Sequence, residues 1–156
     1  MSKTISYRGT LDIGEQDRIS LKTIKGQVGY KIKAFRVMST LPGSGTYELV
    51  GQIFKKDQTG SITATVDFSN SELLAVAFTS GANNASISDN FEDFVIFDNE
   101  KFNQDIFINI TDAGGNTTPA NYYIELETMS LSELETTMLT LKSLRTATSQ
   151  WVNNII

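Results

Sequence analysis

At 156 residues, with 40% hydrophobic and 20% charged residues, the chain has the size and composition of one folded domain, which excludes wholesale disorder. Its net charge of −5 argues against a surface for nucleic acid or an anionic membrane, because such surfaces need clustered Lys and Arg. The chain has no Cys and no His, which excludes disulfides and thiolate metal sites and removes the usual general base near neutral pH.

Apolar and polar residues alternate with a period of two along most of the chain, and turn residues separate the alternating runs. This pattern predicts short β-strands. The first two strands are centred on Ile5–Tyr7 and Ile19–Leu21, with a turn at Asp12–Glu15 between them. In the stretch GYKIKAFRVM the apolar residues change parity near Ala34. We predict a β-bulge or bend there, since one extra residue exchanges the two faces of a strand.

The middle of the chain continues this pattern with a loop over 41–46, a strand over 46–54, a polar turn over 55–60 and a strand over 61–68. In the last of these, SITATVDF, we expect Ile62, Ala64, Val66 and Phe68 to point inward. The run LLAVAF is continuously apolar, as is typical of a central strand buried on both faces. Residues 79–90 are rich in Ser, Gly, Ala and Asn and predict the longest loop.

The stretch FDNEKFNQDIFINITD, residues 97–112, contains acids, amides and large apolar residues. We interpret it as a β-hairpin: Asp98–Lys101 has the composition of a turn and Phe102 anchors that turn. Its later residues Ile106, Ile108 and Ile110 are expected to face the core. A further loop over 112–120 leads to a last strand over 121–129, in which Tyr122, Ile124 and Leu126 share one face.

After Met129 the apolar period changes to three and four residues, which predicts a helix from 133 to about 145. Ser132 and Glu135 have the spacing of a capping box at its start. The predicted fold is therefore all-β, an antiparallel β-sandwich or jelly roll of about eight or nine strands with a C-terminal α-helix. We divide the chain into a sandwich domain, 1–129, and a helix with an apolar tail, 130–156, for docking or oligomerisation. The residues predicted to form this interface are Leu134, Met138, Leu141, Trp151, Val152, Ile155 and Ile156.

Carboxylates offer two chemical alternatives to these structural interpretations. A calcium site needs six to eight oxygen ligands, but the acidic stretches lack the spacing and central Gly of an EF-hand loop. Its candidate ligands are Asp89, Asn90, Glu92, Asp93, Asp98, Glu100, Asp105 and Asp112. Asp67 and Glu72 are candidates for the paired acids of a glycoside hydrolase, but we favour solvated turns as the explanation for both. We predict no catalytic residue, no cofactor and no metal site.

Aromatic residues could form a sugar-stacking platform if several of them faced solvent together. Because most lie on the inward parity of their strands, we favour core packing for this set, which comprises Tyr7, Tyr30, Tyr47, Phe54, Phe78, Tyr122 and Tyr123. The apolar tail around Trp151 is too short to bury itself and needs a groove on its own domain or on a neighbour, and both options stay open.

No apolar run of signal-peptide length occurs near the N-terminus, and no segment approaches the roughly 18 apolar residues of a membrane span. We therefore expect no membrane association, and we expect the protein to stay in the cytoplasm or to be assembled into a larger structure there.

Several stretches together resemble small virion structural proteins of marine tailed bacteriophages. They are SYRGTLDIGEQDRISL, GYKIKAFRVM with the following LPG, TVDFSNSELLAVAF, FVIFDNEKFNQDIFI and NYYIELETMSLSELE ending near TLKSLR. In order and spacing the resemblance covers about residues 4–145. The resemblance brings no catalytic residues. It implies a capsid decoration or cement protein that contacts the major capsid protein or other virion proteins, is localised in the virion and forms a homo-oligomer such as a trimer. Alternatives are a head-tail connector, a tail accessory protein, or a glycan-binding module on a tail appendage.

Overall fold

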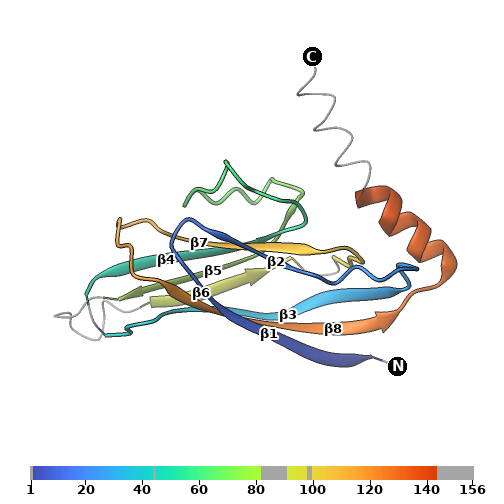
Figure 1. Cartoon of the computed structure of the whole chain (residues 1–156), viewed down its shortest axis with the longest axis horizontal. Coiled ribbons are helices and arrows are strands. Elements are labelled where there is room, and N and C mark those ends of the chain that lie inside the picture. Colours follow the sequence, from blue (N-terminus) through green and yellow to red (C-terminus); the bar gives the residue numbers. More distant parts are fainter. Residues whose placement is uncertain (1, 44, 82–90, 98–99, 144–156) are drawn as a thin grey trace, which may run out of the picture.

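The alternating segments of the sequence form two antiparallel sheets that face each other, as the computed structural model shows (Figure 1). The structure describes residues 2–43, 45–81, 91–97 and 100–143. Its strands are β1 (Lys3–Leu11), β2 (Gln16–Ile19), β3 (Val28–Ser39), β4 (Tyr47–Phe54), β5 (Leu73–Gly81), β6 (Phe91–Ile96), β7 (Ile106–Asp112) and β8 (Ala120–Ser130). A C-terminal helix over 133–143 follows β8. The predicted all-β sandwich with a terminal helix is confirmed.

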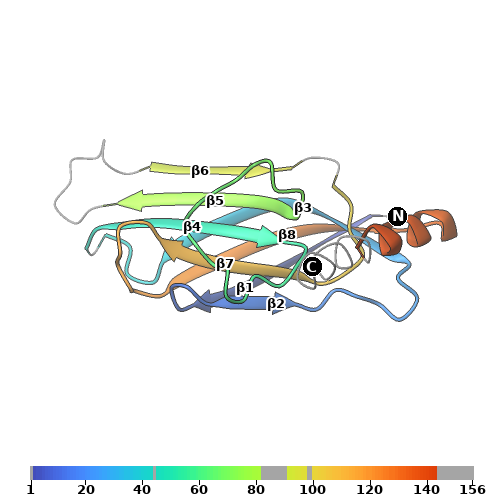
Figure 2. The ribbon, with the colours of Figure 1, turned by 90° about the horizontal axis from the view of Figure 1, so that it is seen from above.

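The two sheets are unequal in width. The smaller has the strand order β1-β8-β3, and the larger has the order β2-β7-β4-β5-β6. This strand order differs from that of a regular jelly roll in one strand. In a regular jelly roll, the strand equivalent to β6 lies beside the equivalent of β3, which gives two four-stranded sheets. Here β6 pairs with β5, so the larger sheet extends beyond β3 at one edge (Figure 2).

The core lies between the sheets and is built from the inward residues of both. Phe35 and Ile124 in the smaller sheet, and Ile53 and Ile108 in the larger sheet, are completely buried. Full burial of one such side chain stabilises the fold by roughly 1.5–3 kcal/mol. The parity that the sequence predicts for β7 and β8 is therefore confirmed.

Two further sequence predictions are confirmed in β3 and β5. The register between β3 and β8 shifts between Ile32 and Ala34, which is the predicted bulge. Because of this shift, Phe35 and Val37 point into the core. In β5 the residues from Leu73 to Ala77 are all buried, with some in the main core and others in a second apolar cluster on the outer face of the sheet.

The prediction of a strand over 61–68 is wrong. This segment crosses the outer face of the larger sheet (Figure 2), and the Gln52 side-chain amide donates hydrogen bonds to the Thr63 and Thr65 carbonyls, at 3.2 and 3.3 Å. Two backbone carbonyls of the segment 61–68 therefore accept hydrogen bonds from a side chain and not from a neighbouring strand. Ala64 packs on the outer apolar cluster, whereas Val66 and Phe68 are exposed and do not point into the core.

The prediction of a hairpin over 97–112 is also wrong, although its strands exist. β6 pairs with β5, while β7 pairs with β4 and β2, so two strands separate them in the sheet. The connection instead crosses to the other sheet, where Phe102 and Tyr30 exchange backbone hydrogen bonds of 2.8 and 3.0 Å and their rings stack. Phe102 is buried and anchors the connection as predicted. However, it anchors it to the smaller sheet, although the connection joins two strands of the larger sheet.

The helix begins with the predicted capping box. The Ser132 hydroxyl accepts a hydrogen bond from the Glu135 N–H at 3.2 Å, and the Glu135 carboxylate accepts from the Ser132 N–H at 3.4 Å. This reciprocal pair satisfies donors that the first turn of a helix otherwise leaves free.

Across the described residues, no helix combines the length and apolar character needed to cross a membrane.

Candidate interaction surfaces

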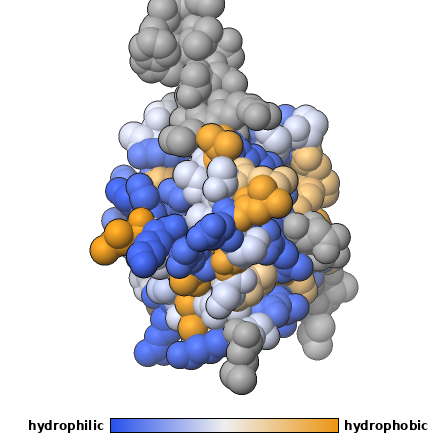
Figure 3. Space-filling view, turned by 90° about the vertical axis from the view of Figure 1, so that its right-hand side faces the viewer, coloured by the Kyte–Doolittle hydropathy of each residue, from blue (hydrophilic) through white to orange (hydrophobic). Residues whose placement is uncertain are grey.

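The apolar face of the C-terminal helix points into solvent. Leu134, Met138 and Leu141 follow one another at steps of four and three residues, so they lie on one side of the helix. Their side chains are 70%, 60% and 53% exposed, respectively. We call these three residues the helix stripe. Figure 3 looks onto the helix end of the molecule, where apolar groups lie at the surface among hydrophilic ones.

Polar contacts attach the opposite side of the helix to the sandwich. Asn103 donates hydrogen bonds from its side-chain amide to the Thr140 hydroxyl and to the Gly26 carbonyl, each at 3.1 Å. Lys101 forms an ion pair with Glu135 at 3.4 Å. Amphipathic helices of globular proteins normally turn their apolar face to the core. Among its described residues this helix turns Leu139 toward the sandwich but exposes the three residues of the helix stripe, which are free to contact another surface.

Glu100 links the helix to the larger sheet by binding two lysines. It forms an ion pair with Lys142 of the helix at 3.1 Å and another with Lys55, which follows β4. Burial of Glu100 opposes its ionisation, but hydrogen bonds from Lys55 and Lys142 outweigh burial and lower the pKa of its carboxyl. Beside these charges, Phe102 and Leu139 line a small cavity of about 30 Å³ between helix and sandwich.

The other predicted interface residues, Trp151, Val152, Ile155 and Ile156, lie outside the described residues, as does most of the predicted loop over 79–90. The predicted loop over 112–120 is described between β7 and β8. Asn116 holds it against the segment before β4 by donating to the Thr46 carbonyl at 2.9 Å.

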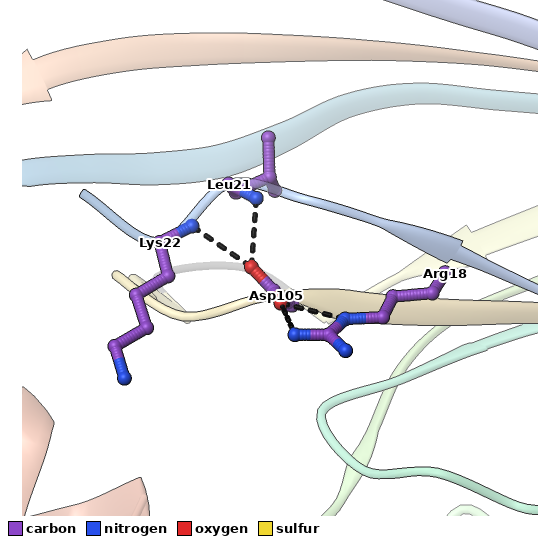
Figure 4. Close-up of polar contacts among 4 residues, drawn as sticks. All are labelled: Arg18, Leu21, Lys22 and Asp105. Atoms are coloured by element: carbon purple, nitrogen blue, oxygen red, sulfur yellow. Dashed lines mark hydrogen bonds and ion pairs between the residues drawn. The ribbon is translucent and has the colours of Figure 1, made fainter.

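Acids considered as candidate calcium ligands form hydrogen bonds and ion pairs with different protein groups. Asp105 accepts hydrogen bonds from the Leu21 and Lys22 N–H groups, at 2.8 and 2.9 Å, and binds Arg18 (Figure 4). Burial opposes its ionisation, but these bonds lower the pKa of the Asp105 carboxyl. Glu92 pairs with Arg36. Among the described residues no three acids lie close enough to hold a metal ion, and Asp89, Asn90 and Asp98 are not among them.

The two acids considered for glycoside hydrolysis also belong to local structure. The Asp67 carboxylate accepts hydrogen bonds from the Ser69 hydroxyl and N–H, at 2.6 and 2.9 Å, and these bonds lower its pKa. Glu72 lies 3.5 Å from the Lys56 ammonium in an ion pair between largely buried side chains. Asp67 is thus bound within its own turn, and Glu72, just before β5, is paired with Lys56, just after β4.

Most of the candidate aromatic residues lie in apolar clusters, but Tyr123 does not. Tyr30 and Tyr122 are buried in the main core, as expected, and Phe54 is buried in the outer apolar cluster, whereas Tyr123 is 38% exposed on the outer face of the smaller sheet. Its hydroxyl donates to the Glu125 carboxylate at 3.1 Å, which raises the pKa of Tyr123.

A depression of about 720 Å³ contains Tyr123 and extends over the smaller sheet toward β4 and β6. Its polar lining includes Arg8, Thr10, Arg36, Glu92 and Asn121. Apart from Glu92, the sequence pattern did not single out these residues, since alternation in a strand reports only which side chains face outward. Their meeting depends on the register between strands far apart in the chain.

Comparisons of the chain with family models, curated proteins and solved structures gave no significant match.

Proposed function

We propose that this protein is a structural component of a bacteriophage particle without catalytic activity, specifically a decoration or cement protein that binds the assembled capsid. The outward position of the helix stripe is the observation that carries the proposal, and the resemblance of residues 4–145 to virion proteins supports it. A head-tail connector or tail accessory protein would use the same kind of contact. The β-sandwich fold alone does not imply a role, because one fold hosts many functions.

The helix stripe favours association between copies of this chain. Its steps of four and three residues place Leu134, Met138 and Leu141 at successive d, a and d positions of a heptad, the seam along which helices pack in coiled coils. Burial of a whole Leu or Met side chain contributes roughly 1.5–3 kcal/mol, so three side chains that are each more than half exposed together offer more than the contribution of one. A symmetric oligomer would multiply weak contacts with the capsid through avidity.

The experiment compares the wild type with a Leu134→Gln/Leu141→Gln variant and with a Glu133→Gln control on the same helix. We expect the wild type and the control to sediment as an oligomer and to bind purified capsids. The double variant is expected to be monomeric and to lose capsid binding. Because both side chains are exposed in the monomer, its melting temperature should equal that of the wild type at protein concentrations low enough for the wild type to dissociate. An oligomer that persists in the double variant would contradict the role of the stripe.

Mass spectrometry of purified particles tests the location of the protein. Decoration requires a fixed, stoichiometric number of copies for each particle, and complete absence from particles would end the proposal.

Truncation before Ser149 tests the predicted contribution of the tail. Loss of capsid attachment with an unchanged melting temperature supports docking by residues 149–156.

A further inference from the structure

Three side chains form a row across the outer face of the smaller sheet, inside the depression of about 720 Å³. Arg8 of β1 and Arg36 of β3 are both in register with Tyr123 of β8, which lies between them. Because neighbouring strands are about 4.8 Å apart, the backbones of the two arginines lie roughly 10 Å apart, with the tyrosine ring between them. This arrangement places an aromatic surface between two guanidinium groups.

This face has the opposite charge balance to the chain as a whole. The chain carries a net charge of −5. On the outward positions of β1, β8 and β3, however, the cationic residues Arg8, Lys31, Lys33 and Arg36 exceed the acidic residues Glu125 and Glu127. The excess of cations on this face therefore favours the approach of an anionic group from this side.

The arginines are available to a ligand. Arg8 forms no ion pair with any residue in the described part of the chain. Arg36 pairs with Glu92 at 3.1 Å, but both side chains are more than half exposed, and such surface pairs contribute little net stability. A planar carboxylate can accept two parallel hydrogen bonds from one guanidinium group, which adds directional specificity to the charge attraction.

Polar groups next to the row match a ligand that carries hydroxyl groups. The Thr10 hydroxyl donates to the side-chain carbonyl of Asn121 at 2.7 Å. This bond directs the Asn121 carbonyl toward Thr10, and no described residue accepts a hydrogen bond from the Asn121 NH₂ group. The Tyr123 hydroxyl is fixed by Glu125, so the ring is oriented before a ligand arrives.

We propose that this depression binds an acidic saccharide of the uronate class, with a carboxylate on Arg8, which has no ion pair among the described residues, and an apolar sugar face on Tyr123. The volume lies within the range of about 300–1,000 Å³ typical of small-ligand sites, which also combine an apolar floor with a few converging polar groups. A peptide of acidic residues would use the two arginines but would leave the tyrosine face and the Asn121 amide without matching groups. This site shares no residue with the helix stripe, so the saccharide proposal and the oligomer proposal can be tested independently.

Calorimetric titration of the full chain with an oligogalacturonate tests the proposal, with a neutral malto-oligosaccharide of equal length and an oligoglutamate as comparison ligands. We expect the uronate to bind, with an affinity that falls as salt is added, and the two comparison ligands to bind at least tenfold more weakly. Arg8→Gln and Tyr123→Ala are each expected to weaken uronate binding about tenfold, the order of one lost charge-assisted contact.

The control variant is Lys31→Gln, which removes a cation from the same sheet face but outside the depression. It should bind the uronate within about twofold of the wild type, and all three variants should keep the wild-type melting temperature because the side chains are at the surface. The proposal is overturned by any of three results: no uronate binding, equal binding of oligoglutamate or the neutral sugar, or wild-type affinity in Arg8→Gln and Tyr123→Ala. Oligomer formation and capsid binding by these variants report separately on the helix stripe.

Discussion

The Tyr122 hydroxyl donates a hydrogen bond of 2.7 Å to the Asp17 carboxylate and so joins the two sheets of the sandwich. Tyr122 lies in β8 of the smaller sheet and Asp17 in β2 at the edge of the larger one. Burial, together with the bond to Asp17, raises the pKa of Tyr122. The hydroxyl therefore stays protonated, and able to donate, at neutral and moderately alkaline pH.

Tyr122→Phe should reduce the free energy of unfolding by roughly 1–3 kcal/mol, since it leaves a partly buried carboxylate without its donor. Urea denaturation at neutral pH measures this change. The matched control is Tyr123→Phe, which removes a hydroxyl from the adjacent, exposed residue and should change stability by less than about 0.5 kcal/mol. Equal effects from the two substitutions would contradict a special role for the bond between the sheets.

Gly51→Ala should destabilise the fold by roughly 1–3 kcal/mol through overpacking between the sheets. A Cβ at Gly51 would lie 2.6 Å from a methyl carbon of Val37 and 2.9 Å from the ring of Phe35. Thermal denaturation of Gly51→Ala, Val37→Ala and the double variant completes a mutant cycle. The double variant should be more stable than the sum of the single effects predicts, because the smaller side chain at 37 makes room; strict additivity would count against the steric explanation.

Asp105 should make the stability of the fold depend on pH in the acid range. The pKa of its carboxyl is lowered in the folded state, so its contribution is complete above the unfolded pKa of about 3.9 and is lost as the pH falls through the folded value. Asp105→Asn should therefore cost roughly 1–3 kcal/mol at pH 7, and the difference from the wild type should shrink toward pH 2. Denaturation at several pH values tests this, with Asp12→Asn in an exposed turn as control. A difference that stays constant with pH would exclude the charge as its cause.

Ser132→Ala should weaken the first turn of the helix by about 1 kcal/mol, because it removes the hydroxyl that accepts from the Glu135 N–H. Hydrogen exchange of the helix amides should become about fivefold faster, while exchange in the strands stays unchanged. Thr137→Ala, an exposed change in the middle of the same helix, is the control and should leave exchange the same or slower. Faster exchange in the control as well would point to a general loosening of the helix.

Features that depend on neighbouring residues could be predicted from the sequence. The parity change near Ala34 predicts the bulge in β3, and the spacing of Ser132 and Glu135 predicts the cap of the helix. Both are local, since a bulge changes the face of the next residue and a cap spans one turn. The exposure of the helix stripe was only in part predictable, because periodicity identifies an apolar face without stating what that face contacts.

Features that depend on pairing over long distances could not be predicted in the same way. The composition of 97–112 identifies two strands and a turn but not that β4 and β5 separate the strands in the sheet. Alternation over 61–68 reports contact with an apolar surface, here the outer face of the larger sheet and not the core. The row of Arg8, Tyr123 and Arg36 requires strand register across more than 80 residues, and no local pattern contains that information.

The pairing of the first strand with the last has a consequence for how the chain reaches its fold. Lys3 is in register with Thr128, and their contact closes a loop of almost the whole described chain. During synthesis β1 must wait for β8 to leave the ribosome, and β3 must wait for the same strand, so the smaller sheet assembles only after translation of nearly all the domain. Such high contact order predicts folding in milliseconds to seconds, slow for a domain of this size.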